Sequence, residues 1–137
     1  MPVFPASAVL LPLAAVAPGT RVRLVGDDRR HADPLAQLGL AVVRDGPAPW
    51  AVAWRTVDGL YDPALRRLRD ALLPGGWIVV ALATDTPAGA DATPTALVAR
   101  MEDVGLVLAD APARDTDADG TPIVRGLFRR VDPGVIA

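Results

Sequence analysis

Side chains able to do chemistry gather at two turns of this 137-residue chain. The first turn, residues 26–31, reads Gly-Asp-Asp-Arg-Arg-His and contains the chain's one histidine. A histidine beside carboxylates can serve as a general base, because its unperturbed pKa lies near neutrality. We expect His31 instead to be a solvated loop residue. One histidine among scattered aspartates makes neither a catalytic set nor a metal site.

The second turn, residues 115–120, reads Asp-Thr-Asp-Ala-Asp-Gly and has the opening spacing of a calcium loop. Such a loop needs a bidentate glutamate six residues after its glycine, and that position is Gly126. The pattern therefore favours a polar hairpin turn and no metal site.

Three tryptophans flank the two most apolar stretches of the chain, at Trp50, Trp54 and Trp77. Packing in a core or an interface is the commoner use of such side chains. Trp54, at the end of its stretch, could also line a pocket. We find no nucleophile–base–acid set, phosphate loop or paired glutamates, so no catalytic residue is assigned.

The composition limits the classes of function. The net charge is −2, so no basic excess exists to neutralise phosphates, and a nucleic-acid partner is not expected. Without cysteine there is no disulfide or thiolate site. Residues 1–18 lack a basic start and contain Pro5 and Pro12, so we expect an N-terminal helical segment, no membrane association and a cytoplasmic protein.

The elements that would position these residues alternate between strand and helix. Apolar runs predict strands, and each predicted helix begins at a proline that follows Asp33, Asp62 or Thr93. Such alternation predicts a parallel sheet with helices on its faces, and a helix-free last connection makes the final pair antiparallel. We predict one α/β domain over 1–137, with a parallel core over 21–83 and a terminal helix and hairpin over 95–130. The expected strands cover 21–25, 40–43, 50–54, 77–83, 106–109 and 121–130.

The stretch from Trp50 to Leu82 organises this pattern. It runs from a buried strand through an amphipathic helix that starts at Asp62-Pro63, then through a Leu-Pro-Gly-Gly turn into a second buried strand. This order resembles the class I S-adenosylmethionine-dependent methyltransferase family. The resemblance covers most of the chain, and it implies a Rossmann-like mixed sheet of about six strands that binds S-adenosylmethionine at its strand ends.

The departures from the family lie where the cofactor would bind. The resemblance places the cofactor at Gly26, Asp28 and Asp45, with Trp54 towards the methyl acceptor. However, Gly26 is the only glycine left in the loop, and Leu24 stands where the family has an acid. Six residues separate Val43 from Trp50, too few for the βα unit that the family has there.

Two functions follow as hypotheses. In the first, a shortened and degenerate methyltransferase-like protein binds no cofactor, is non-catalytic and acts through protein contacts, as a homo-oligomer or with a protein partner. Loss of one unit would uncover apolar sheet surface near 40–43, which self-association would cover. In the second, a compact methyltransferase of unknown acceptor binds S-adenosylmethionine, with a partner subunit completing the pocket. A third, broader possibility is a different small ligand at the strand ends.

Overall fold

The chain forms a six-stranded mixed sheet with helices on both faces. The computed structural model describes residues 8–26, 28–55, 60–86, 92–117 and 120–132. The sheet order is β2-β1-β3-β4-β6-β5. The first four strands are parallel, and β6 is antiparallel to both of its neighbours. The elements are η1 (Ala8–Ala15), β1 (Arg21–Leu24), α1 (Ala32–Gln37), β2 (Ala41–Val43), β3 (Ala48–Trp54), α2 (Asp62–Asp70), β4 (Leu72–Ala83), α3 (Pro94–Asp103), β5 (Leu106–Thr116) and β6 (Pro122–Arg130).

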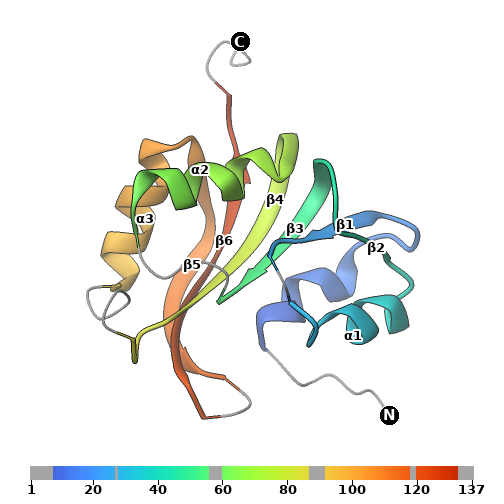
Figure 1. Ribbon diagram of the computed structural model, residues 1–137, viewed down its shortest axis with the longest axis horizontal. Helices are drawn as coiled ribbons and strands as arrows, with labels where there is room; N and C mark the ends of the chain where they lie inside the picture. The colour runs from blue at the N-terminus through green and yellow to red at the C-terminus, as the bar shows by residue number, and fades with distance from the viewer. Residues whose placement is uncertain (1–7, 27, 56–59, 87–91, 118–119, 133–137) are drawn as a thin grey trace.

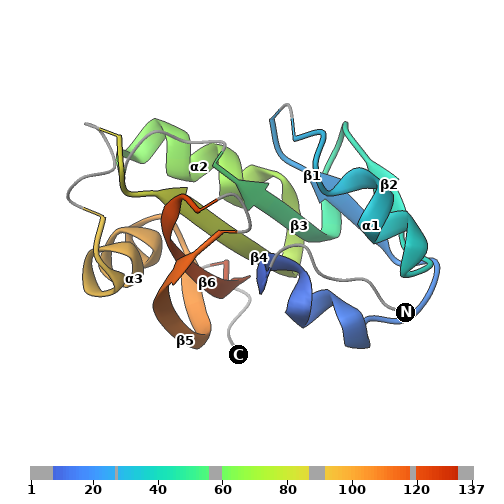
Figure 2. The same cartoon turned by 90° about the horizontal axis from the view of Figure 1, so that it is seen from below.

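The predicted mixed sheet, with its C-terminal antiparallel hairpin, is confirmed. Side chains alternate along each central strand between two cores. On one face Ile78 and Val80 pack against α2 and α3, and on the other Val79 and Ala81 pack with η1 and α1. Figure 1 shows α2 and α3 beside the β4–β6 half of the sheet, and η1 and α1 beside the β1–β2 half. Figure 2 shows α2 and η1 on opposite sides.

The proline signals locate two helix starts correctly. Helix α2 begins at Asp62 with proline in its first turn, and Thr93 Oγ1 accepts a hydrogen bond from the Ala96 N–H at the start of α3. The prediction that Asp62 caps α2 was wrong, because Tyr61 holds the cap position. The prediction that Asp33 caps α1 was also wrong. The cap position is His31, whose side chain is turned away from the helix to Asp28, and Asp33 lies in the first turn. Strand β5 is also longer than expected, because it continues through shifts in its pairing with β6 to Thr116.

The missing unit is replaced by a crossing of four residues, 44–47, between β2 and β3. Val43 pairs with Arg23 on one side of β1, and Trp50 pairs with Val22 on the other. The crossing must span two strand spacings sideways and about three residues along the strands, so the end of β2 and the start of β3 lie roughly 14 Å apart. Five Cα steps reach about 18 Å at most, so the crossing is nearly taut. It passes over the face that carries Arg23, whose Nη1 donates to the Gly46 carbonyl at 2.7 Å.

The apolar surface expected near β2 is present only in part, since Ala41 is exposed and Val43 is half-buried beside arginines of β1. The side chains of β1 on the α2 side are Arg21, which is exposed, and Arg23, which is partly buried. Among the described residues, the exposed large apolar side chains are Tyr61 and Val107, and neither is on β1 or β2. Strand β2 is nevertheless an edge strand of the sheet. Loss of the unit therefore leaves a face on which the arginines of β1 lie beside partly exposed apolar residues of β2.

Within the described ranges, no helix is both long enough and apolar enough to cross a bilayer.

Candidate functional site

Polar and aromatic side chains converge at the carboxyl ends of β1 and β3. In open α/β sheets, ligands bind at this edge. Strand β1 ends at Leu24 and leads into the turn that holds Asp28 and His31. Strand β3 ends at Trp54, and the next residue, Arg55, has a φ of 57°. That value lies in the left-handed region, which is rare for residues with a Cβ.

Asp28 and His31 form a buried pair. Their side chains are fully buried, and His31 Nδ1 lies 2.8 Å from Asp28 Oδ2. The other carboxylate oxygen, Oδ1, accepts hydrogen bonds from the backbone N–H groups of Arg30 and His31 at 2.8 and 3.2 Å. Both oxygens of Asp28 are thus bonded within the turn. The expectation that His31 is a solvated loop residue was wrong, because this pair draws the ring into the interior.

The environment of Asp28 favours its charged form. Burial raises the pKa of Asp28. The side-chain hydrogen bond and charge of His31, together with the backbone N–H groups of Arg30 and His31, lower this pKa by more than burial raises it. The resulting pKa lies below the ordinary value of 3.8. An ionised Asp28 requires the proton of His31 to be on Nδ1. The Nε2 atom of His31 is buried and has no hydrogen-bond partner among the described residues.

Trp54 joins this pair to the β5–β6 hairpin. Its indole lies edge-on to His31, with ring centroids 5.2 Å apart and planes at 76°. Its Nε1 donates to Asp117 Oδ2, which also accepts from Arg55 Nη2 at 2.9 Å. The guanidinium groups of Arg30 and Arg55 lie 5.1 and 4.5 Å from the centre of the indole ring, within the range of cation–π attraction. The cluster links residues from three separate segments: the turn after β1, the end of β3 and the β5–β6 hairpin.

Asp117 and Arg55 were missed by the sequence interpretation. Asp117 was treated as part of a polar turn, but it is only 5% exposed. The turn is present, since the Gly120 N–H donates to the Asp117 carbonyl. The aspartate spacing of this turn was the available signal, but it was compared only with the pattern of a calcium loop. Asp119, part of that pattern, lies outside the described residues. No group of metal-ligand type was found in the described part of the chain.

The four predicted cofactor residues divide into two kinds. Asp28 and Trp54 meet through His31, and their polar atoms are engaged with other protein groups. Gly26 and Asp45 are exposed. Gly26 has a φ of 74°, so glycine suits this turn, and Asp45 lies in the crossing between β2 and β3. The Arg44 side chain joins the two regions by donating to the Asp28 carbonyl at 2.7 Å.

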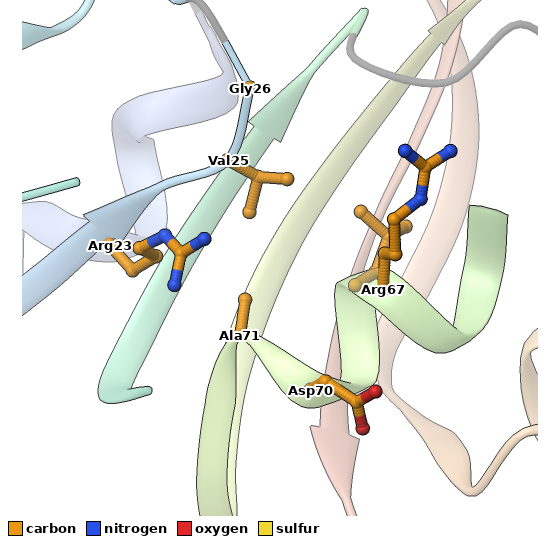
Figure 3. A pocket seen from close by; sticks show the side chains of 7 residues that line it. Arg23, Val25, Gly26, Arg67, Asp70 and Ala71 are labelled. Carbon is orange, nitrogen blue, oxygen red and sulfur yellow. The ribbon is translucent and has the colours of Figure 1, made fainter. Parts of the chain in front are cut away.

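A hollow of about 290 Å³ lies beside this cluster, between β1 and α2. Figure 3 shows Arg23 on the β1 side and Arg67 on the α2 side, with Val25 pointing into the space between them. The remaining lining residues are Gly26, Leu68, Asp70 and Ala71. This hollow occupies the face that the four-residue crossing leaves without a helix.

A second hollow, of about 590 Å³, lies on the η1 side of the sheet. Trp50 and Trp77 stack across β3 and β4, with centroids 5.9 Å apart and planes at 17°. The Arg129 guanidinium lies 5.5 Å from the centre of the Trp77 ring. The tryptophans are partly exposed, and the other lining residues are Pro12, Asp110, Arg125 and Leu127. We call this surface the tryptophan face.

The described residues fit S-adenosylmethionine poorly. A cofactor loop must bring its backbone close to the ligand, and glycine permits this because it lacks a Cβ. Here the turn after Gly26 is organised around the inward Asp28 carboxylate, which is fully buried and hydrogen-bonded within the turn. Asp45 is exposed and could still accept from ribose hydroxyls. One side of a cofactor site is therefore available and the other is filled by protein.

Solved methyltransferase structures align with nearly the whole chain. The 1,6-didemethyltoxoflavin-N1-methyltransferase of Burkholderia thailandensis, solved with S-adenosylhomocysteine bound, aligns with a TM-score of 0.63 and 14% identity. The alignment covers 91% of this chain and 79% of that one. The N-methyltransferase NodS from Bradyrhizobium japonicum aligns with a TM-score of 0.54 and 14% identity, covering 90% and 93%.

A structure named for different chemistry aligns as well. The [4+2]-cyclase SpnF has a TM-score of 0.52 and 14% identity, with coverage of 89% and 80%. Identities this low show the fold alone, which is that of the class I methyltransferases. Neither a family model nor a curated protein matches the sequence.

Proposed function

We propose that this chain is a methyltransferase-fold protein that transfers no methyl group and works through contact with a second copy or a protein partner. One observation carries the proposal: both oxygens of the Asp28 carboxylate are bonded inside the turn where the cofactor loop would lie. Opening that turn for a ligand would leave His31 Nδ1 and two backbone N–H groups without acceptors. Each such buried loss costs about 1–3 kcal/mol.

The fold itself does not require methyl transfer. The [4+2]-cyclase SpnF is named for another reaction and shares the architecture. Function on a common fold depends on the residues of the site. In this chain the site residues are tied to one another, which supports a role other than cofactor chemistry.

The tryptophan face supports the proposed contact. Tryptophan and arginine are enriched where proteins bind one another. Trp50 and Trp77 present a stacked, partly exposed pair beside Arg129 and Leu127. With Asp110 and Arg125 also lining the hollow, this surface combines an aromatic centre with charges of both signs. A second copy or a partner protein is the occupant that we propose for it.

Calorimetric titration tests the first half of the proposal. S-adenosylmethionine and S-adenosylhomocysteine are added in turn to the full chain, up to millimolar concentration. We expect no heat of binding above the heat of dilution. Dissociation constants in the micromolar range would overturn the non-catalytic proposal.

Sedimentation equilibrium at tens of micromolar tests the second half. We expect self-association that Trp77→Ala weakens. The matched control is Tyr61→Ala, which removes an exposed aromatic side chain away from the tryptophan face and should leave association unchanged. A monodisperse monomer would argue against a second copy as the occupant. Equal weakening by both variants would rule out this face as the contact.

The alternative function is a compact S-adenosylmethionine-dependent methyltransferase completed by a partner subunit. The exposure of Gly26 and Asp45 at one edge of the sheet favours it. Gly26, Asp28, Asp45 and Trp54 would then line the cofactor site. In the same calorimetric experiment, micromolar binding that Asp45→Ala weakens at least tenfold would support this alternative.

A further inference from the structure

We infer that the hollow between β1 and α2 binds a small oxyanion, a carboxylate or a phosphate, between Arg23 and Arg67. This site adjoins the turn at Asp28, because Gly26 lines it, and it lies on the other side of the sheet from the tryptophan face. It follows from the four-residue crossing, because a helix there would cover the hollow. The inference holds whether or not the chain binds S-adenosylmethionine.

Arg23 is held in place with one edge of its guanidinium unused. Its Nη1 donates to the Gly46 carbonyl at 2.7 Å, which fixes the group against the crossing. Its Nε is buried and has no hydrogen-bond partner among the described residues. A guanidinium offers two parallel N–H groups from Nε and one Nη, and this fork matches the oxygens of a carboxylate or phosphate. An oxyanion would supply the missing acceptor.

Arg67 adds a second positive charge from the opposite wall. It is exposed on α2, and no polar side-chain contact is described for it. The one carboxylate of the lining, Asp70, already has a cation, because its Oδ1 lies 3.2 Å from both Nε and Nη2 of Arg69. In Figure 3 this carboxylate points away from Arg23. The space between the walls is therefore net positive.

The size and floor of the hollow limit the ligand. A volume of about 290 Å³ lies at the small end of the range for ligand sites. Val25, Leu68 and Ala71 give it an apolar floor. These features suit a compact anion with a short apolar body.

The test follows the Nε–Hε resonance of Arg23 by NMR. Sodium phosphate and sodium acetate are titrated separately into the full chain, with sodium chloride as the reference at equal ionic strength. We expect a saturable shift with one or both oxyanions and none with chloride. The anion that saturates at the lower concentration identifies the class. Shifts no larger than those with chloride would overturn the inference.

Substitutions on α2 test the location of the anion site. A hydrogen bond to a charged group changes affinity by about ten- to a hundredfold. Arg67→Gln should therefore weaken anion binding roughly tenfold or more. The matched control is Arg66→Gln, an exposed neighbour on α2 outside the hollow, which should leave binding unchanged. Equal weakening by both variants would show general charge attraction and would overturn the site.

Arg23 is tested with two substitutions, followed through backbone amide signals of Val25 and Gly26. Arg23→Gln removes the charge, and Arg23→Lys keeps it but lacks the planar fork. We expect loss of saturation in the first and weaker binding in the second. Unchanged binding in either variant would contradict the role of Arg23. Should Arg23→Gln fail to fold, the comparison of Arg67→Gln with Arg66→Gln decides the question.

Discussion

The indole Nε1 of Trp54 donates to the Asp117 carboxylate at 2.5 Å, joining residues 63 positions apart. This bond ties the carboxyl end of β3 to the tip of the β5–β6 hairpin. Asp117 also accepts from Arg55 and is nearly fully buried. Because Trp54 in turn contacts His31, the hairpin and the turn after β1 are parts of one connected cluster.

Removal of the Asp117 carboxylate should destabilise the fold. Asp117→Ala leaves the N–H groups of Trp54 and Arg55 without this acceptor, and we expect a loss of about 1–3 kcal/mol in the free energy of unfolding. Urea denaturation measures it. The control is Asp115→Ala, which breaks the more exposed bond to Arg125 and should cost less than about 1 kcal/mol. A larger loss at Asp115 would contradict the importance of the buried bond.

The Asp28–His31 pair should make stability depend on pH in acid. The pKa of Asp28 is lowered in the folded state, so its stabilising effect is fully present above the ordinary value of 3.8 and is lost as the pH falls through the lowered value. Asp28→Asn removes this titration. At pH 7 we expect the variant to be less stable by about 1–3 kcal/mol.

The same comparison repeated across acid pH provides the check. The difference in unfolding free energy between the wild type and Asp28→Asn should shrink below pH 3.8, because the wild-type carboxylate becomes protonated. Guanidinium denaturation at intervals from pH 7 to pH 2.5 measures it. A difference that stays constant over this range would contradict a lowered pKa at Asp28.

The predicted elements came from local signals, and the site did not. Proline after Asp62 or Thr93 determines a helix start within a few residues, so a sequence pattern reveals it. The length between Val43 and Trp50 was also sufficient to predict the missing unit, since six residues cannot hold a helix and a strand. The six-stranded order bears this out.

The cluster at the strand ends depends on contacts that no local pattern contains. The burial of His31 follows from its bond to Asp28 together with the packing of Trp54, which lies 23 residues further on. Asp117 lies further away still, in a turn whose composition is typical of solvent exposure. Arg21 and Arg23 indicate the charged face of β1. That interpretation needs the position of β1 beside the hollow that the four-residue crossing leaves without a helix.

The Leu-Pro-Gly-Gly segment predicted as a turn is instead part of β4 (Leu72–Ala83), and its two glycines should respond differently to alanine. At Gly76 a Cβ would lie 2.9 Å from the Leu73 carbonyl oxygen and 3.0 Å from that of Pro49. These are backbone atoms, so the strands must shift, and we expect a loss of about 1–3 kcal/mol. At Gly75 a Cβ would make only an ordinary contact with Arg129 Nη2 at 3.9 Å, and φ is 78°, so the cost of alanine comes from conformation.

Asparagine distinguishes these two causes. It tolerates the left-handed region better than alanine, so Gly75→Asn should be more stable than Gly75→Ala. At Gly76 asparagine should be no better than alanine, since the clash involves the Cβ itself. Thermal melts of the four variants give the comparison. The same order at both positions would contradict the assignment of separate causes.

Backbone strain at Arg55 gives the last prediction. Its φ of 57° places a Cβ in the left-handed region, where the contact with the following carbonyl costs about 1–2 kcal/mol. Arg55→Ala and Arg55→Gly both lose the bond to Asp117, but only the glycine variant also loses the strain. We expect Arg55→Gly to be more stable than Arg55→Ala by about 1 kcal/mol in urea denaturation. At Arg66, exposed within α2, the order should reverse by a similar amount, because glycine is the poorer helix former. An Arg55→Gly variant less stable than Arg55→Ala, as at Arg66, would show that the left-handed turn at the end of β3 does not form.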